Sequence, residues 1–330
     1  MIVRAFKTYT PINILWLVII LFALRIVFFV NTPDHVNFKL IEPFARVLVP
    51  ANYEQYIGIH LNVFLAAIIV LIQAITLNYM VNHYNLLGKP SFLPALGYIT
   101  LTALFTPFMV LSQPLLCNFL LLWMLFKLLD FYKSDSGKSA SYDLGMIVAV
   151  GTLVYFPFIF LFIVIWIALV IFRPFNWREW VAAVFGYATV FFFLAVYYYL
   201  TDRFRDFYNI WAPLKSKFPN HISIDYYNYL VLIPVIVILL LCIIKLRENF
   251  FRSYVQVRKS FQLLFFIFIV GSLSFYARTE FNLNHFLLCA IPAAVFFAYY
   301  FLYANTKWFF ELLYFILFAA IIYFQLNIQV

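Results

Sequence analysis

Charged residues are scarce in this 330-residue sequence, since only 11% are Asp, Glu, Lys or Arg while 66% are hydrophobic. No polar stretch is long enough to fold as a separate soluble domain, so we predict one integral membrane domain over residues 1–330. Hydrophobic runs of roughly 20 residues, the length that crosses a hydrocarbon core, recur from end to end. The predicted fold class is therefore all-α, a polytopic transmembrane helical bundle.

Cysteine and sequence motifs of metal or nucleotide sites are also lacking. The three cysteines, Cys117, Cys242 and Cys289, lie in hydrophobic runs without CxxC spacing, which supports neither a disulfide framework nor a zinc site. No HExxH, GxSxG, GxGxxG or Walker sequence occurs, and the five histidines lack ligand spacing. We expect the cysteines to be packing residues, and spacing alone predicts no metal site.

Acidic residues are missing from the middle of the hydrophobic runs, which argues against a proton or ion transporter. The net charge of +9 would suggest a nucleic-acid partner for a soluble protein. In a membrane protein, however, basic residues gather at the cytoplasmic ends of helices. No nucleic-acid partner is expected.

The hydrophobic runs predict about 11 spans, within a range of 10 to 12. The run 145–172 decides the count, because its 28 residues would form a helix of about 42 Å, well beyond a core of about 30 Å. A hairpin at Pro157 places 14 Lys and Arg residues on the cytoplasmic side and 7 outside, whereas one crossing gives about 11 and 10. The hairpin is favoured, with a cytoplasmic N-terminus. The remaining spans are expected near 11–30, 57–79, 92–109, 114–130, 180–200, 227–244, 261–277, 285–303 and 308–326.

The first polar interruption, residues 31–54, is expected to face the exterior and to contain helices lying in the membrane interface. Its apolar residues recur at helical spacing and its charged residues share the opposite face, as in a helix with one face in lipid. Asp34, His35 and Glu42 would then be held at the lipid surface. Just before this loop, Arg25 could either extend toward the exterior interface or pair with an acid in a polar cavity.

A second exterior turn, residues 278–285, combines opposite charges with hydrogen-bonding side chains. Arg278 and His285 could bind a phosphate at the membrane surface, with Glu280 and Asn284 beside them. The alternative is a solvated turn holding an Arg–Glu pair. Polar residues inside the second span, Gln73 among them, are expected to form helix-to-helix hydrogen bonds.

Several segments resemble the C-type (GT-C-like) superfamily of membrane glycosyltransferases, which use polyprenyl-phosphate-linked sugars at the outer face of the membrane. ALRIVFFVNTPDHVNFKLIEPF is similar to their first span and acidic exterior loop, and TALFTPFMVLSQPLLCNFLLLWMLFKLLDFY to their tightly paired third and fourth spans. NHFLLCAIPAAVFFAYYF is similar to a later span that opens with Arg-Tyr and carries a proline. The RPFNWREW elbow resembles an uncharacterised bacterial inner-membrane family, which implies an inner-membrane location.

The superfamily resemblance implies roles for individual residues. Asp34 would match the acid that serves as base or metal ligand, which leaves room for a divalent cation as the only implied cofactor, and Glu42 is a second catalytic candidate. The substrate-binding candidates are Arg25, His35, Asn118, Arg278, Glu280, Asn284 and His285. Asn118 stands where many members carry an acid, and His285-Phe286 takes the place of the Arg-Tyr pair.

Two hypotheses follow. In the first, the protein acts on or binds a polyprenyl-phosphate-linked sugar at the periplasmic face, so its partner is a membrane lipid. In the second, it is a non-catalytic scaffold or subunit of a cell-envelope complex, and its partners are membrane proteins. A transferase requires Asp34 and Arg278 to converge on one lipid-accessible cavity.

Overall fold

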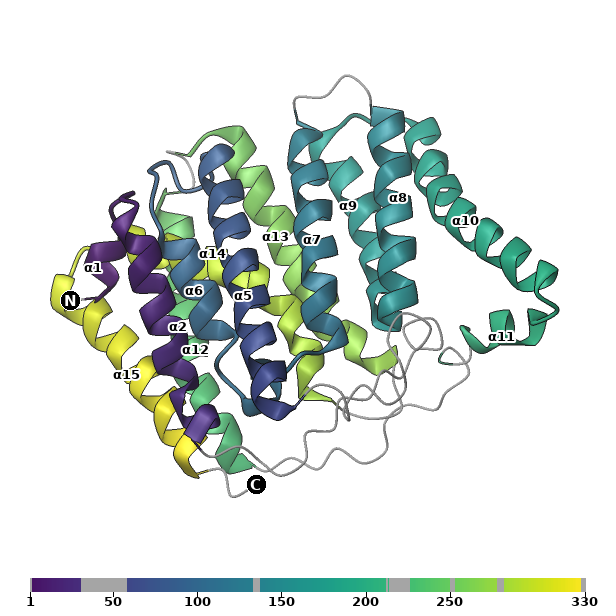
Figure 1. The fold of residues 1–330 in the computed structure, drawn as a ribbon. Coiled ribbons are helices and arrows are strands. Elements are labelled where there is room, and N and C mark those ends of the chain that lie inside the picture. The colour runs from purple at the N-terminus through teal and green to yellow at the C-terminus, as the bar shows by residue number, and fades with distance from the viewer. Residues whose placement is uncertain are drawn as a thin grey trace.

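The computed structural model describes residues 2–30, 58–132, 137–211, 213, 226–249, 253–277 and 282–327, and within these ranges it contains helices and no strand. Figure 1 shows the longer helices as a bundle of roughly aligned rods. The α-helices are α1 (Ile2–Phe6), α2 (Ile12–Val30), α5 (Ile59–His83), α6 (Leu93–Leu101), α7 (Gln113–Asp130), α8 (Gly137–Val154), α9 (Leu161–Phe172), α10 (Trp177–Leu200), α11 (Phe204–Asn209), α12 (Leu232–Asn249), α13 (Val255–Leu273), α14 (Leu287–Tyr303) and α15 (Lys307–Asn327). Short 3₁₀ helices are η1 (Thr106–Met109), η2 (Phe156–Phe160), η4 (Tyr226–Val231), η6 (Ser274–Ala277) and η7 (Leu283–Phe286).

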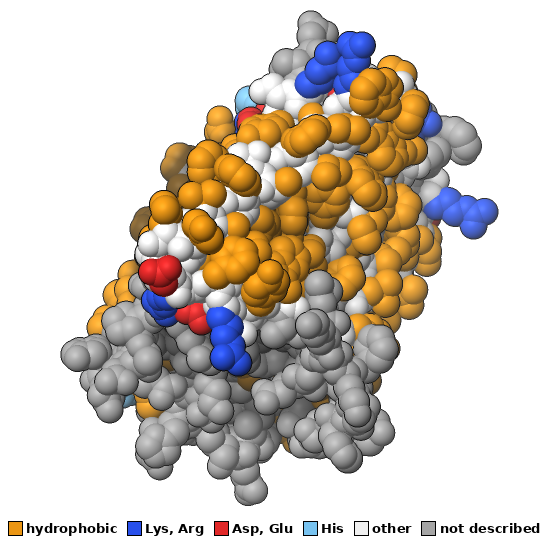
Figure 2. All heavy atoms as spheres, turned by 90° about the vertical axis from the view of Figure 1, so that its right-hand side faces the viewer, with side chains coloured by type: hydrophobic (Ala, Val, Ile, Leu, Met, Phe, Trp, Pro, Cys, Tyr) orange, Lys and Arg blue, Asp and Glu red, His pale blue; other side chains and the backbone are white. Residues whose placement is uncertain are grey.

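Seven helical segments in the described ranges are long and apolar enough to cross a membrane. They are Ile59–His83, Gln113–Asp130, Trp177–Leu200, Tyr229–Asn249, Val255–Tyr276, Leu283–Tyr303 and Trp308–Leu326. Ile12–Ile26 and Phe156–Phe172 are shorter apolar helices. One face of the molecule carries a broad hydrophobic field with charged side chains near its two ends (Figure 2), the distribution expected of a protein that spans a bilayer.

Helix α14 forms the centre of the bundle. Every residue from Leu287 to Phe301 is buried, and the helix contacts α6, α7, α12 and α13. A helix that is hydrophobic on all sides is stable only when neighbours surround it, and α14 meets this condition despite Pro292 in its interior. The three cysteines are buried and form no disulfide with one another, as predicted for packing residues.

The segment 145–172 doubles back as the hairpin hypothesis predicted. Helix α8 ends at Val154, η2 contains Pro157, and α9 begins at Leu161. Helices α8 and α9 contact each other and lie side by side in Figure 1. Proline removes a backbone donor and clashes with the preceding turn, so an uninterrupted helix through Pro157 is disfavoured.

The span predicted over 92–109 is wrong because it is longer than the helix in the structure. Helix α6 ends at Leu101 after nine residues, and the chain continues through a turn into η1. The Thr102 hydroxyl donates to the Ile99 carbonyl at 3.1 Å, and Pro107 disfavours a helical conformation at Thr106. At 1.5 Å per residue, α6 covers only about 13.5 Å of the bundle.

Helices α8 and α10 pack so closely that Gly145 and Gly186 have no room for a side chain. A Cβ atom on Gly145 would collide with the Ala183 carbonyl oxygen, and one on Gly186 with the Tyr142 carbonyl oxygen. Small residues at such contacts let helices approach within a membrane. The other side of α10 is open, with Phe185, Phe192 and Phe193 each more than 60% exposed.

A candidate functional site around buried Arg25

Four of the nine predicted site residues lie in the described ranges: Arg25, Asn118, Asn284 and His285. The other five lie outside the described residues: Asp34, His35, Glu42, Arg278 and Glu280. The proposed convergence of Asp34 and Arg278 on one cavity therefore remains a prediction.

Arg25 on α2 is completely buried, which excludes the extension toward the interface considered from the sequence. Its Nη1 atom donates to the Met109 carbonyl at 3.1 Å. Its Nε and Nη2 atoms are buried and have no hydrogen-bond partner in the described parts of the chain. Because a guanidinium carries five N–H donors and stays charged, it requires an acceptor or an anion at this place.

Asn118 on α7 belongs to a chain of hydrogen bonds through the bundle. Its Nδ2 atom donates to the Tyr98 hydroxyl and to the Leu287 carbonyl, both at 3.0 Å. Tyr98 donates to Gln73 Oε1 at 2.7 Å, and Gln73 Nε2 donates to the Leu115 carbonyl at 2.7 Å. These bonds join α5, α6, α7 and α14, so the predicted helix-to-helix role of Gln73 is confirmed.

One hydrogen-bond acceptor in this network is not satisfied within the described residues. The Asn118 Oδ1 atom is buried without a hydrogen-bond partner in the part of the chain that the structure describes. A buried polar atom without a partner costs free energy unless a ligand or water satisfies it. Asn118 thus has one side-chain atom committed to the fold and another still able to bind a ligand.

His285 is 2% exposed and is held on both sides of its ring. Its Nε2 atom lies 2.8 Å from the Gly271 carbonyl and 3.0 Å from Ser274 Oγ, and its Nδ1 atom lies 2.7 Å from the Tyr155 hydroxyl. A carbonyl can only accept, so Nε2 carries a hydrogen and donates it, and Nδ1 is the atom that faces the Tyr155 hydroxyl. His285 therefore joins α13, η6 and the α8–η2 corner to the start of α14.

The four residues cluster at one end of the bundle. Helix η1 supplies the carbonyl that binds Arg25, and it contacts η7, which carries Asn284 and His285. Helix α7 also contacts η7, and Asn118 reaches the Leu287 carbonyl just beyond it. The Asn284 Oδ1 atom has no hydrogen-bond partner among the described residues. Two amide oxygens and two of the three guanidinium nitrogens, Nε and Nη2 of Arg25, thus lie around η1 and η7 without a hydrogen-bond partner in the described ranges.

Polar pairs elsewhere have structural roles. Asn176 accepts from the Arg178 backbone at 3.3 Å, as expected of the residue that caps α10. Glu179 pairs with Arg173 at 3.3 Å, and both side chains are largely buried against Gly137. Burial and the neighbouring Asp130 carboxylate raise the pKa of Tyr84, whose hydroxyl donates to that carboxylate at 2.6 Å. Within the described ranges, no group of three or more His, Cys, Asp or Glu residues could hold a metal ion.

Sequence reasoning did not single out Tyr98, Tyr155 or Ser274, which complete the two networks. Each is one hydroxyl within an apolar run, and no spacing distinguishes it from its neighbours. The available signal is that a buried tyrosine hydroxyl needs a partner. That rule applies only once burial is known.

The fold and this polar interior define a helical protein with seven helices suited to crossing a membrane and a buried arginine at one end of the bundle. The chain belongs to a family of unknown function, DUF6427, whose family model matches residues 44–330. Arg25, Asp34, His35 and Glu42 precede the matched region. No curated protein and no solved structure matches the chain.

Proposed function

We propose that the protein binds the phosphate of a polyprenyl-phosphate-linked sugar at the exterior end of its membrane bundle and acts there as a glycosyltransferase-like protein of the inner membrane. One observation carries the proposal: the buried guanidinium of Arg25, with Nε and Nη2 unpartnered in the described parts of the chain. Arginine binds phosphate oxygens through two parallel N–H donors, and a desolvated site strengthens such bonds.

The chemistry that we propose for this site uses one carboxylate and one guanidinium. The carboxylate of Asp34, nine residues beyond Arg25 in the sequence, removes the proton of an acceptor hydroxyl. The hydroxyl oxygen bonds to the anomeric carbon as the bond from that carbon to the lipid phosphate breaks. Arg25 stabilises the departing polyprenyl phosphate. Asn118 Oδ1 and Asn284 Oδ1 accept hydrogen bonds from sugar hydroxyls.

The proposed topology is eleven crossings with a cytoplasmic N-terminus, as in the superfamily that the sequence resembles. The eleven segments are the seven long apolar helices together with α2, α8, α9 and the stretch that runs from α6 through η1. Helix α6 is short, and α8 is the least hydrophobic of the four. Cysteine labelling of the loops before α5 and after α10 from outside the cell tests the assignment of the exterior end.

The ligand proposal is tested with purified protein and polyprenyl phosphate. We expect the lipid to raise the unfolding temperature of the wild type and to have no effect on Arg25→Gln. Arg203→Gln is the control, because Arg203 is exposed and pairs only with the neighbouring Asp206 among the described residues. Equal stabilisation of the wild type and Arg25→Gln would contradict the proposal.

A second candidate function is a scaffold for another membrane protein, and the open face of α10 favours it. Only 17% of the most apolar stretch of this helix is buried inside the bundle. Cross-linking in native membranes from a photoreactive residue at Phe193 tests it. A defined protein adduct would support the scaffold, and adducts with lipid alone would exclude it at this face.

A further inference from the structure

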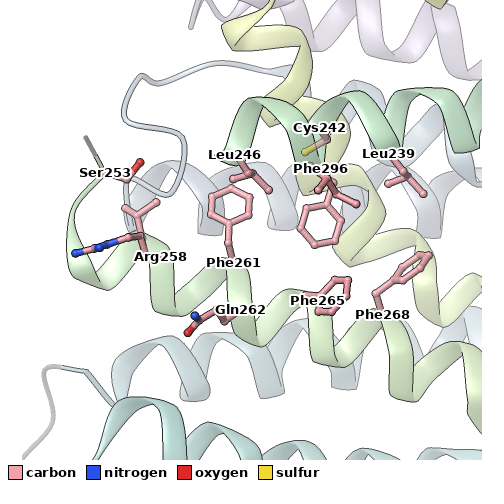
Figure 3. A pocket seen from close by; sticks show the side chains of 12 residues that line it. Leu239, Cys242, Leu246, Ser253, Arg258, Phe261, Gln262, Phe265, Phe268 and Phe296 are labelled. Atoms are coloured by element: carbon pink, nitrogen blue, oxygen red, sulfur yellow. The ribbon is translucent and has the colours of Figure 1, made fainter. Parts of the chain in front are cut away.

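A groove at the basic end of helices α12 and α13 lies apart from the Arg25 region and has a different chemistry. Its volume is about 340 Å³, within the range of small-molecule sites. In Figure 3, Leu239, Leu246, Phe261, Phe265 and Phe268 line it from α12 and α13, with Phe296 of α14 between them. The walls present almost no polar surface over this length.

The polar lining residues gather at one end of the groove. Ser253 and Arg258 lie beside the connection between α12 and α13, and Gln262 is one turn further along α13. Four basic residues with described positions lie near this connection: Lys245, Arg247, Arg258 and Lys259. The described acid among them, Glu248, pairs with Lys245. The connection beside the mouth thus has more basic than acidic residues among those described, and Arg258 lines the groove itself, while the interior is apolar.

The groove opens to the outer surface of the bundle. Ile243 and Phe265 line it and are 54% and 47% exposed. Both walls are helices long and apolar enough to cross a membrane, so in a bilayer this opening would face the hydrocarbon core. An apolar slot with a basic mouth at the membrane surface matches an acyl chain joined to an anionic headgroup.

We propose that this groove is a binding site for an anionic phospholipid of the leaflet at the basic end of the bundle, with one acyl chain between α12 and α13 and the headgroup phosphate at Arg258. The site would anchor the α12–α13 connection to that leaflet. It is independent of the polyprenyl-phosphate proposal, because the two regions share no residue.

Native mass spectrometry of detergent-released protein, titrated separately with phosphatidylglycerol and phosphatidylcholine, tests the site. We expect one tightly retained phosphatidylglycerol and weaker retention of phosphatidylcholine. Arg258→Gln should weaken phosphatidylglycerol binding about fivefold, as expected for one basic residue near a membrane surface, without changing phosphatidylcholine binding. Arg178→Gln, an exposed arginine outside the groove, should have no effect.

Groove-filling variants test the acyl chain. Leu239→Trp should abolish the retained lipid, whereas Leu240→Trp should not, because Leu240 is 56% exposed and does not line the groove. Leu246→Phe is a smaller second filler if Leu239→Trp does not fold, and gel filtration verifies each protein. Unchanged phosphatidylglycerol retention in the folded filler would overturn the site. Equal affinity for the two lipids would overturn the headgroup assignment.

Discussion

Arg25 donates one hydrogen bond to the Met109 carbonyl at 3.1 Å, and its other two nitrogen groups have no partner in the described chain. Removing this charge should therefore cost the ligand-free protein little. We expect Arg25→Gln to unfold at the same or a higher denaturant concentration than the wild type, since an unpaired buried charge is unfavourable.

Arg173 is the matched comparison for Arg25, because it is an arginine whose acidic partner, Glu179, is described. The Arg173–Glu179 pair is buried, so Arg173→Gln leaves a buried carboxylate unpaired and should lower the free energy of unfolding by about 3 kcal/mol. A similar loss in Arg25→Gln would mean that the counter-ion of Arg25 is a residue of the chain and not a ligand.

Tyr98→Phe tests the network through the bundle centre. The change removes the hydroxyl that donates to Gln73 and accepts from Asn118, and we expect a loss of about 1–2 kcal/mol in unfolding free energy. Tyr79→Phe, on an exposed ring of α5, is the control and should change stability by less than about 0.5 kcal/mol. Equal effects of the two substitutions would show that the network contributes nothing to stability.

Gly186→Ala tests the contact between α8 and α10. The added Cβ meets the Tyr142 carbonyl, so the helices must separate, at a cost of about 1–3 kcal/mol. Gly58→Ala introduces the same methyl group where nothing lies within 4 Å, and it should cost less than about 1 kcal/mol, the part due to alanine at the N-cap of α5. Thermal unfolding in detergent compares them, and a neutral Gly186→Ala would mean that the close helix contact is wrong.

His285→Ala separates a structural role from ligand binding. Loss of the bonds to Tyr155 and Gly271 should lower the unfolding free energy by about 2 kcal/mol, while His83→Ala, at an exposed position, should not. Polyprenyl-phosphate affinity per folded molecule should stay within twofold of the wild type. A larger loss of affinity would restore His285 to the phosphate site that the sequence suggested.

The helical class and the break at Pro157 could be predicted because run length and proline act locally. The length of α6 was not predicted, because hydropathy stays high from Leu101 to Met109 and gives no signal that the helix ends at Leu101. The cap that Asn176 provides at the start of α10 is local in the same way, since its side chain accepts from a backbone N–H two residues further on.

The site was harder to predict than the fold. The burial of Arg25 depends on α2 packing against neighbours distant in the sequence, and its contact is a backbone carbonyl, which every residue has. His285 illustrates the same limit. The composition of the turn 278–285 suggested phosphate binding, whereas in the structure both ring nitrogens of His285 contact groups from three packed elements. The identities of polar residues are visible in a sequence, but their partners depend on tertiary contacts.

The most direct test of the central claim is the dipolar coupling between the phosphorus of bound polyprenyl phosphate and ¹⁵N-labelled arginine side chains, measured by solid-state NMR. Arg25→Gln identifies the signal of that one residue. If Arg25 donates hydrogen bonds of about 2.8 Å to phosphate oxygens, a guanidinium ¹⁵N resonance should be dephased by the phosphorus of the bound lipid. This dephasing should disappear in Arg25→Gln. Dephasing that persists unchanged in Arg25→Gln, or no dephasing with lipid bound, would contradict the central claim.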